Sequence, residues 1–319
     1  MGSLPVSLKE LDRVEVLTLM DNFVDVLLED TEIVTRPPKA TGEELPTDTL
    51  LAEHGLCLLV RVQRGAEKHT VLFDTGYNNM GVLHNMRKLA VDPNEMEAIV
   101  LSHAHMDHTG SLNPILEKIS DPIPVVIHPD AFLYPRFIEE KDGTRRRMPR
   151  TLVREKLSQG KGELLESKNP TPIVDDTILV TGEVERTTAF EKGMPNALIE
   201  RDGVLQRDAV TDDQALVMNL KEKGLVVISG CSHTGIVNTV RYAKKLTGVE
   251  KVHAVLGGFH LSGPFYEKIL GKTIDQLKAL SPAVVVPMHC TGRKAMEQFA
   301  REFPSAFELN SVGSTITLE

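Results

Sequence analysis

Short apolar runs alternate with amphipathic segments along most of the chain, and this alternation constrains the fold more than any other feature of the sequence. Each run is rich in Val, Ile and Leu and stops at turn residues, as buried β-strands do. Segments 236–246, 269–280 and 295–303 place apolar residues at helical spacing, which predicts helices that cover the sheets. An α/β fold is therefore expected. The predicted strands are 14–20, 56–62, 70–73, 98–101, 124–127, 177–180, 215–220, 225–229, 252–256 and 283–286.

The length and composition of the chain fit one large globular domain. Its 319 residues are 41% hydrophobic and 25% charged, far from the composition of disordered chains. No linker and no internal repeat divides the sequence, so residues 1–319 are interpreted as a single domain. Segment 131–169, rich in charged residues and glycine, has the character of an insertion. It is either a solvated loop with a short helix around 152–157 or a lid over a functional site.

Net charge, apolar run lengths and cysteine content restrict the partners and the compartment. A formal net charge of −9 argues against a nucleic-acid partner. No apolar stretch approaches the ~18 residues that span a bilayer, so no membrane partner is expected. The N-terminal residues lack a secretory signal pattern, and the 3 cysteines do not suggest a disulfide framework. We therefore expect a cytoplasmic protein that acts on a small molecule, with homo-oligomerisation left open.

The strongest functional signal is the sequence Ser-His-Ala-His-Met-Asp-His, which directly follows the predicted strand 98–101. In an extended stretch, His103 and His105 point to the same side and can bind one ion. Asp107 and His108 follow the bend and can reach a second ion. Imidazole and carboxylate together suit zinc, iron or manganese, of which zinc is favoured. Packing explains the cluster poorly, because charged imidazoles would repel one another without a metal.

Three further predicted strands in the C-terminal half each lead into a histidine, and these are His233, His260 and His289. Functional groups gather at the carboxyl ends of strands in layered α/β folds, so these side chains are expected to share a cavity with the His-rich sequence. Taken alone, each of the three would more often be a hydrogen-bonded core or surface histidine, and the His-rich sequence is what favours a role at a metal site. The histidines without such a context are interpreted as ordinary residues: His54, His69, His84, His128 and His253.

Asp74 stands at the end of the predicted strand 70–73, within the sequence Phe-Asp-Thr-Gly. Its carboxylate could orient a metal-bound histidine by accepting a hydrogen bond from the other ring nitrogen. Asp-Thr-Gly is also a common turn, so a purely structural role stays open.

These motifs together resemble the metallo-β-lactamase superfamily. Closer similarity to the branch named for 7,8-dihydropterin-6-methyl-4-(β-D-ribofuranosyl)aminobenzene-5′-phosphate synthase is carried by four segments. The resemblance implies an αββα sandwich of two mixed sheets flanked by helices, with one or two divalent metal ions at the sheet edge. The four segments are Gly-Glu-Val-Glu-Arg at 182–186, Ser-Gly-Cys-Ser-His-Thr-Gly-Ile at 229–236, Leu-Gly-Gly-Phe-His-Leu at 256–261 and Pro-Met-His-Cys-Thr-Gly at 287–292.

The resemblance also implies a ligand set. His103 and His105 would bind the first metal, Asp107 and His108 the second, and His289 matches the last histidine of the family.

The chain departs from the family pattern at two places. Where most relatives have a third-motif histidine, it offers Asp212 and Asp213, either of which could supply an oxygen. Where many relatives have a bridging aspartate, it has Cys231, with His233 close behind. We expect His233 to be a ligand in preference to Cys231, because a thiolate usually needs partial exposure and positive surroundings.

The expected activity is hydrolysis of a small anionic, phosphate-bearing substrate by a metal-bound hydroxide. In this reading Asp107 holds the nucleophile or receives its proton, and His260 orients a phosphate or acts as general acid. The arginines Arg145, Arg146 and Arg147 are predicted to bind the substrate anion.

Two alternatives remain open. One is a transferase that joins a dihydropterin methyl diphosphate to an aminobenzene ribosyl phosphate and releases pyrophosphate, as the closer resemblance implies. The other is a non-catalytic metal or ligand sensor, for which the cysteine at the bridging position is the main support.

Overall fold

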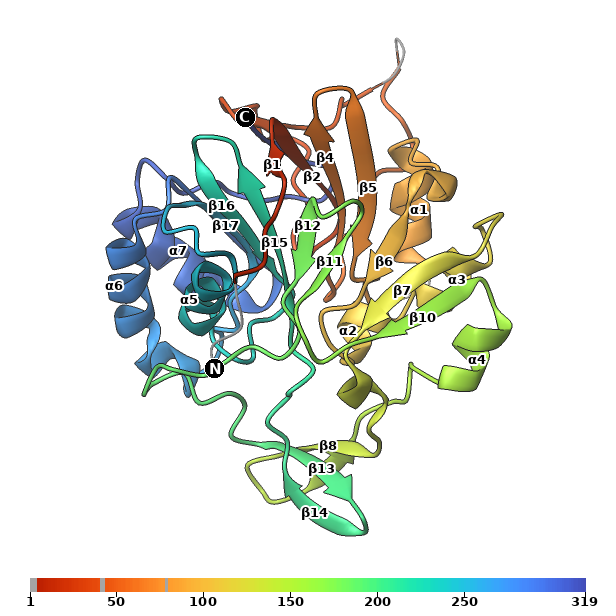
Figure 1. The fold of residues 1–319 in the computed structure, drawn as a ribbon, viewed down its shortest axis with the longest axis vertical. Helices are drawn as coiled ribbons and strands as arrows, with labels where there is room; N and C mark the ends of the chain where they lie inside the picture. The colour runs from red at the N-terminus through yellow and green to blue at the C-terminus, as the bar shows by residue number, and fades with distance from the viewer. Residues whose placement is uncertain (1–4, 41–43, 78–79) are drawn as a thin grey trace.

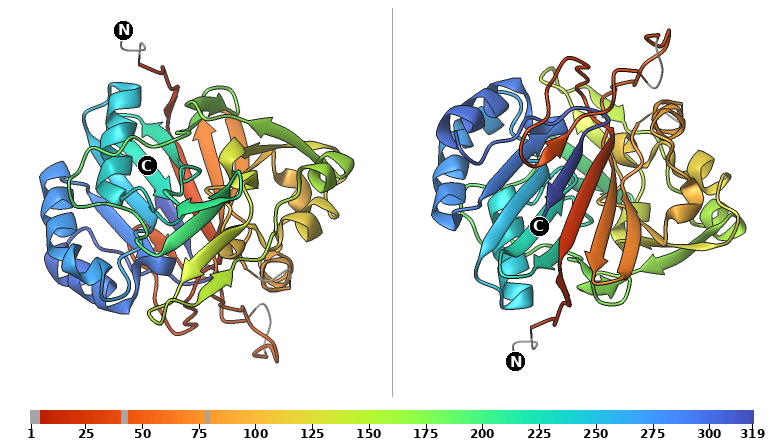
Figure 2. Two further views of the ribbon diagram at one scale, coloured as in Figure 1. Left: turned by 90° about the horizontal axis from the view of Figure 1, so that it is seen from below. Right: turned by 90° about the horizontal axis from the view of Figure 1, so that it is seen from above.

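The computed structural model describes residues 5–40, 44–77 and 80–319, and in it two large sheets face each other between outer layers of helices (Figure 1). The two views in Figure 2 show the helices on the outer side of each sheet. The predicted αββα arrangement of the α/β fold is confirmed. No helix among these residues is both long enough and apolar enough to cross a bilayer.

The first sheet contains the C-terminal strands that lead to the predicted site. Its order is β11-β12-β15-β16-β17-β18, and β1 pairs in parallel with β15. Strands β16, β17 and β18 are parallel neighbours, so their carboxyl ends lie at one edge. The bounds are β1 (Glu10–Leu11), β11 (Thr171–Ile173), β12 (Ile178–Val180), β15 (Ala215–Leu220), β16 (Gly224–Ser229), β17 (Val252–Gly258) and β18 (Val284–Met288).

The second sheet has the order β10-β7-β6-β5-β4-β2-β19-β3. Its strands β5, β6, β7 and β10 are parallel, and the His-rich sequence begins where β6 ends. The bounds are β2 (Arg13–Met20), β3 (Val34–Thr35), β4 (Cys57–Arg64), β5 (Glu67–Phe73), β6 (Ala98–Val100), β7 (Ile123–Ile127), β10 (Gly162–Glu166) and β19 (Thr315–Leu318).

The helices lie outside the sheets, as the sequence predicts. Helices α5, α6 and α7 pack on the first sheet, and α1, α3 and α4 pack on the second (Figure 1). The bounds are α1 (Gly81–Lys88), α2 (Met106–Thr109), α3 (Leu112–Leu116), α4 (Arg154–Gln159), α5 (Ile236–Thr247), α6 (Leu270–Leu280) and α7 (Arg293–Glu302), with short 3-10 turns at Pro93–Glu95, Pro129–Phe132, Tyr266–Lys268 and His289–Thr291.

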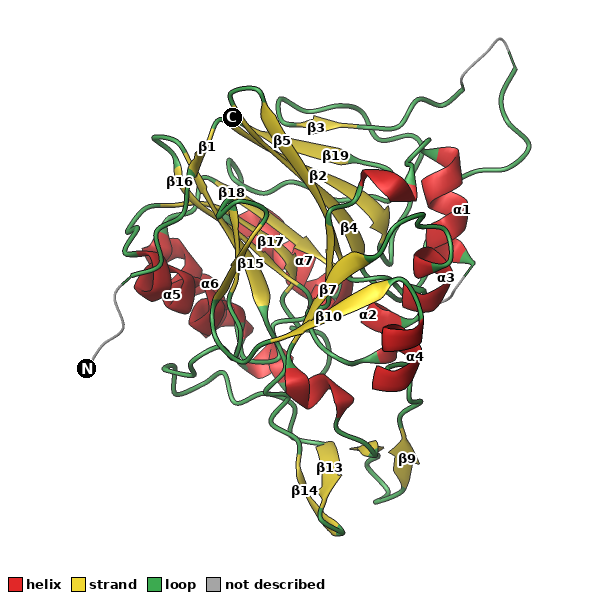
Figure 3. Ribbon diagram, turned by 45° about the vertical axis from the view of Figure 1, so that its right-hand side comes forward, coloured by secondary structure: helices red, strands yellow, loops and turns green. Residues whose placement is uncertain are grey.

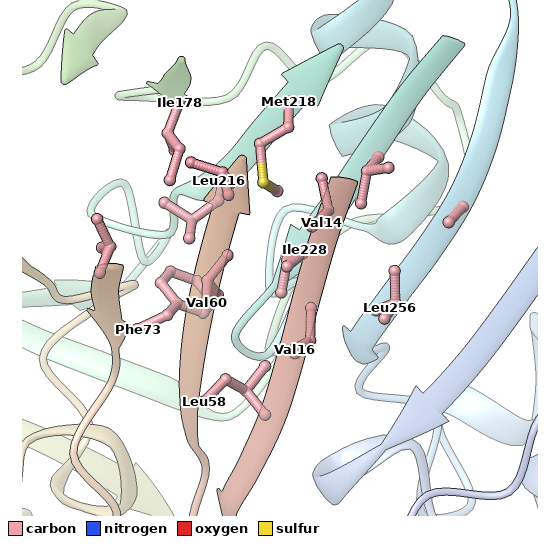
Figure 4. Close-up of a cluster of buried hydrophobic side chains, with 14 of the residues drawn as sticks. Val14, Val16, Leu58, Val60, Phe73, Ile178, Leu216, Met218, Ile228 and Leu256 are labelled. Carbon is pink, nitrogen blue, oxygen red and sulfur yellow. The ribbon is translucent and has the colours of Figure 1, made fainter. Parts of the chain in front are cut away.

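The inner faces of the two sheets form one apolar core (Figure 4). Val60 and Phe73 on the second sheet pack in the same cluster as Leu216 and Ile228 on the first, and all four are fully buried. Alternate residues of each strand reach this core, while the others face the helices. The rigid sandwich holds the strand ends, and therefore the loops that follow them, in fixed positions.

Segment 131–169 has more regular structure than the predicted loop with a short helix. It contains β8 (Arg136–Glu139), β9 (Arg145–Arg147), α4 and β10, and β10 extends the second sheet next to β7. Strands β8 and β9 join β13 (Ala197–Arg201) and β14 (Val204–Arg207) in a small third sheet, which projects below the sandwich (Figure 1). The role of the segment as a lid stays a prediction.

Candidate metal centre

The predicted histidines meet at the edge where strands of both sheets end. Figure 3 shows the strands of the two sheets in yellow between helices in red. β6 leads into His103 and His105, and β16, β17 and β18 lead into His233, His260 and His289. Close approach of the two sheets is possible because residue 230 is glycine: a Cβ there would lie 2.1 Å from Ser102 Oγ. Side chains separated by more than a hundred residues in the sequence therefore become neighbours.

Several residues at this edge adopt left-handed backbone conformations that are costly for residues other than glycine. The φ angles are 61° at Asp74, 53° at Ser232, 44° at His260 and 50° at His289. Such conformations cost of order 1–3 kcal/mol each and cluster at functional sites. The sandwich therefore holds strained backbone at the position where the histidines converge.

Three buried imidazoles form the first donor group. His233 Nε2 lies 3.1 Å from His103 Nε2 and 3.1 Å from His105 Nδ1. Donor atoms arranged tetrahedrally around zinc at about 2.0–2.1 Å would lie ~3.3 Å apart, so this spacing fits a shared metal ion. Of the other ring nitrogens, His105 Nε2 and His233 Nδ1 are buried and have no hydrogen-bond partner among the described residues.

The protonation of this group also suits metal binding. Burial lowers the pKa of His105 to about 4 and lowers the pKa values of His103 and His233 well below their usual range, with further lowering from neighbouring imidazoles. All three rings are therefore neutral near pH 7, the state in which an imidazole nitrogen can donate its lone pair to a metal.

A second donor group lies beside the first and carries negative charge. Asp107 Oδ2 is 3.3 Å from His289 Nε2 and 3.8 Å from His108 Nε2. Cys231 Sγ is 3.2 Å from the same His108 nitrogen. Among the described residues, buried His289 Nε2 has no polar neighbour assigned to it other than Asp107. Asp107, His108, Cys231 and His289 can together hold a second divalent ion. Cys231 also lies close to His103 and His233 of the first group.

The electrostatics of the second group favour a cation. Burial would raise the pKa of Asp107, but His108 and His289 outweigh that effect and hold it well below its usual range. Burial likewise opposes charge on His108, yet the carboxylates of Asp74 and Asp107 raise its pKa to about 9. The negative charge that retains this proton would equally retain a divalent metal ion.

Asp74 orients two of the histidines. Its Oδ2 accepts hydrogen bonds from His108 Nδ1 at 2.6 Å and from Ser102 Oγ at 2.7 Å, and its Oδ1 accepts one from the Ser102 N–H at 2.7 Å. Because Ser102 donates to Asp74, its oxygen accepts from His103 Nδ1 at 2.9 Å. These bonds leave Nε2 of both histidines to face a metal, and the role of Asp74 in orienting metal ligands stays a prediction.

His289 is oriented by residues that follow β2, which the sequence analysis did not identify. Asn22 Oδ1 accepts a hydrogen bond from His289 Nδ1 at 2.9 Å, and Asp21 Oδ1 accepts one from the His289 N–H at 2.9 Å. Polar residues at the end of the predicted strand 14–20 were the available signal.

Asp212 and Asp213 lie outside both donor groups. The Asp212 carboxylate accepts hydrogen bonds from Arg136 Nη2 at 2.7 Å and from the Ala104 N–H at 2.9 Å. Asp213 Oδ2 accepts a hydrogen bond from the Thr234 N–H at 2.8 Å and another from the Thr234 hydroxyl. The two aspartates thus support the loops that carry His105 and His233, and the structure does not bring either carboxylate to the imidazoles.

Arg145, Arg146 and Arg147 are exposed on β9. The first two pair with carboxylates of the neighbouring strand and its turn: Arg145 Nε lies 3.1 Å from Glu139 and Arg146 Nε lies 3.0 Å from Glu140. The described residues that line the cavity at the histidines do not include this strand. Their role in substrate binding stays a prediction.

A cavity of about 340 Å³ opens at the two donor groups. His260 lines it, with its ring centroid 4.4 Å from that of His233, and its Nδ1 has no hydrogen-bond partner in the described part of the chain. His54, interpreted from the sequence as an ordinary residue, also lines it: His54 Nε2 is 3.5 Å from Asp107 Oδ2. His54 precedes strand β4 instead of following a strand, so the positions of the strand ends did not predict it.

Cys290 also lines the cavity, although no role at the site was predicted for it from the sequence. Its Sγ lies 3.1 Å from Cys231 Sγ. Burial raises the pKa of the Cys231 thiol well above its usual value. For Cys290, burial is outweighed by the neighbouring thiol and by His289 and His260, which lower its pKa.

Residues 51–289, the part of the chain that carries both donor groups, match the family model of the metallo-beta-lactamase superfamily. The chain belongs to the metallo-β-lactamase superfamily. The donor groups at the edge of its sandwich are candidate metal-binding sites of such a protein.

Two curated relatives come from Methanocaldococcus jannaschii. The chain is 36% identical over 268 residues to 7,8-dihydropterin-6-methyl-4-(beta-D-ribofuranosyl)-aminobenzene-5'-phosphate synthase, covering 83% of this chain and 90% of the relative. It is 34% identical over 250 residues to an uncharacterized protein, covering 78% of this chain and 88% of that one.

A crystal structure described as a metal-dependent hydrolase of the beta-lactamase superfamily is also similar, with a TM-score of 0.71 and 26% identity over 96% of this chain and 98% of the other.

The predicted resemblance to the superfamily and to its synthase-like branch is confirmed. This metallo-β-lactamase superfamily member is an enzyme, since the named relatives are a synthase and a hydrolase. The alternative of a non-catalytic sensor is therefore not carried further.

Proposed function

We propose that the protein is a metal-dependent hydrolase that acts on a small anionic substrate bearing a phosphate group. The observation that carries the proposal is the pairing of a neutral imidazole group with an anionic group around one cavity, with His54 and His260 available on its walls. When bound, divalent ions at such a pair of groups would neutralise substrate charge and activate a nucleophile. We favour zinc, with manganese or iron as alternatives, because the donors are mainly imidazole nitrogens.

Proton transfer in this proposal is assigned to residues that line the cavity. Asp107 remains ionised because His108 and His289 lower its pKa, so it can hold a nucleophile or accept its proton. His260 has a buried ring nitrogen with no partner and can orient a phosphate oxygen or protonate a leaving group. Burial lowers the pKa of His54, with a further contribution from His289, which favours its neutral, proton-accepting form.

The second candidate is the transferase reaction, in which a dihydropterin methyl diphosphate and an aminobenzene ribosyl phosphate combine with loss of pyrophosphate. The specific observation in its favour is the 36% identity to the synthase over nine-tenths of that protein. In this case the same residues would stabilise the departing diphosphate.

One substrate panel separates the two reactions. Purified protein loaded with zinc or manganese is incubated with phosphate monoesters, phosphodiesters and diphosphate esters, and released phosphate is measured. A second arm supplies the pterin diphosphate and the aryl ribosyl phosphate, singly and together, and measures pyrophosphate. Hydrolysis in the first arm supports the main proposal, whereas pyrophosphate that appears only with both substrates replaces it with the transferase. Inactivity in both arms despite bound metal contradicts both.

A further inference from the structure

A second, larger cavity opens beside the metal centre. It has a volume of about 540 Å³ and lies between the segment that follows β2 and helix α7. Asn22, His289 and Gly292 line both this cavity and the one at the donor groups. A cavity of this size falls in the range of ~300–1,000 Å³ typical of small-molecule sites. We call it the α7 groove.

The surface that the α7 groove offers is mainly apolar. Phe23, which is 40% exposed, and Phe307 contribute aromatic rings, and Met296 and Ala300 contribute one face of α7. A large apolar side chain with this exposure is available for contact with a ligand.

The polar groups of the α7 groove are largely satisfied by one another. Asn310 Nδ2 donates to Asp21 Oδ2 at 2.7 Å. Arg293 Nε pairs with Glu297 Oε1 at 2.9 Å, where the Arg293 side chain is 93% exposed. Because these groups already have partners, an apolar ligand would enter without leaving them unpaired.

Asn22 connects the α7 groove to the metal centre. Its Oδ1 accepts from His289 Nδ1 at 2.9 Å, and its Nδ2 lies 3.1 Å from His54 Nδ1. A ligand in the groove would therefore contact Asn22 and its hydrogen-bond partner His289, a candidate metal ligand that also lines the groove. A molecule that places its anionic group at the donor groups would extend its remaining atoms into the groove.

We propose that the α7 groove binds an aromatic, apolar body of the substrate while the phosphate group lies at the metal centre. This inference rests on the proposed function, since it assigns the anionic group to that site. Flat rings suit the groove because Phe23 and Phe307 can pack against them and Met296 can place its sulfur at a ring edge. The substrate class is therefore an aryl-bearing phosphate or diphosphate.

The test compares ligands that share an anionic head but differ in body. Metal-loaded protein is titrated by calorimetry with methylphosphonate, octylphosphonate and 2-naphthylphosphonate, which the enzyme cannot hydrolyse. We expect 2-naphthylphosphonate to bind at least tenfold more tightly than methylphosphonate. Equal affinities, or tighter binding of octylphosphonate than of the naphthyl compound, would overturn the aromatic assignment.

Variants locate the binding site. Ala300→Trp, which fills the α7 groove, should remove the advantage of the naphthyl compound and leave the affinity for methylphosphonate within twofold. Gln298→Trp, on the same helix but outside the groove lining, is the matched control and should change neither affinity. If Ala300→Trp fails to fold, Phe23→Ser provides the same test. An unchanged naphthyl affinity in the folded groove variant contradicts the proposal.

A final arm separates this inference from the proposed function. If methylphosphonate does not bind metal-loaded protein at all, the assignment of the anionic group fails. Binding of uncharged 2-naphthol to the groove is then measured by fluorescence. Binding that Ala300→Trp abolishes supports an aryl site without the phosphate role, and no binding overturns both.

Discussion

The histidine cluster and strand β9 each bring several basic side chains together, but they differ in burial and in hydrogen bonding. Most of the histidines are buried, and several of their ring nitrogens have no hydrogen-bond partner among the described residues. Arg145 and Arg146 are exposed and pair with local carboxylates. The comparison teaches that a binding site is marked by buried groups whose hydrogen-bonding capacity is unmet, more than by the density of charge in the sequence.

The largest effect is expected when one imidazole is removed from the first donor group. His105→Ala should lose the ion held there, reduce activity by more than ~100-fold and lower stability, because bound metal contributes folding free energy. Elemental analysis, activity and thermal unfolding check this. His253→Ala, at a histidine outside both donor groups, is the control. Full metal content in His105→Ala would show that the ligand assignment is wrong.

Arg136 lies on β8, the strand that pairs with β9, but unlike the arginines of β9 it is buried. Its Nη2 lies 2.7 Å from Asp212 and its Nε lies 3.3 Å from Asp208. Arg136→Met would leave two buried carboxylates without their cation, and we expect a loss of ~3–5 kcal/mol in the free energy of unfolding.

Urea denaturation of both arginine variants measures the difference. Arg145→Met, at an exposed ion pair, should cost at most about 1 kcal/mol. Equal losses in the two variants would refute the distinction between buried and exposed arginines.

Asp213, which supports the loop of His233, should make the stability of the protein depend on pH. Burial raises its pKa from 3.8 to about 6, against hydrogen bonds from Thr234. Its Oδ1 is buried and has no hydrogen-bond partner within the described ranges. Because the folded-state pKa is the higher one, protonation stabilises the fold below about pH 4, and that stabilisation is lost as the pH rises through about 6.

Asp213→Asn imitates the protonated form and should therefore abolish a pH dependence of ~2–3 kcal/mol in the free energy of unfolding. Chemical denaturation of both proteins at pH 4 and pH 7 gives the comparison. If the free energy of unfolding changed equally in the two proteins between pH 4 and pH 7, Asp213 would be ionised at both pH values and the prediction would be wrong.

The smallest effect is expected in the arginine strand. Replacing Arg145, Arg146 and Arg147 together with Ala should leave metal content and unfolding temperature nearly unchanged, because exposed ion pairs contribute little. We also expect several-fold weaker binding of phosphate-bearing ligands, more evident at low salt, since long-range attraction is screened. Calorimetric titration at two salt concentrations tests this, and an unchanged affinity at both would remove the strand from the substrate site.

The sequence predicted the sandwich well because most of its strands are apolar runs that stop at turn residues. The predicted strands 14–20 and 215–220 correspond to β2 and β15, and the helix predicted at 236–246 corresponds to α5. Short or polar strands such as β9 and β14 were not predicted, because their residues are exposed and lack an apolar pattern. Each pairs with the strand just before it, β9 with β8 and β14 with β13, and the two hairpins form one sheet only because β8 pairs with the distant β13. Local periodicity does not contain that last contact.

The candidate site was predictable to the extent that its residues follow strands. His103, His233 and His289 could be brought together by that argument alone. His54 could not, because it lies in the loop before β4 and follows no strand. Asn22 does follow β2, but it acts on the site only through its contacts with His54 and His289, which the sequence does not show. Asp212 was a reasonable oxygen donor in the sequence, but buried Arg136 from the third sheet engages its carboxylate. The partner of a buried charge is set by tertiary structure.

The central claim is that imidazoles from separate strands bind one divalent ion. It is tested most directly by anomalous X-ray diffraction at the metal absorption edge on crystals of the metal-loaded protein. We expect a peak about 2.0–2.1 Å from His103 Nε2, His105 Nδ1 and His233 Nε2. A metal-loaded crystal with no peak between these three nitrogens would contradict the account.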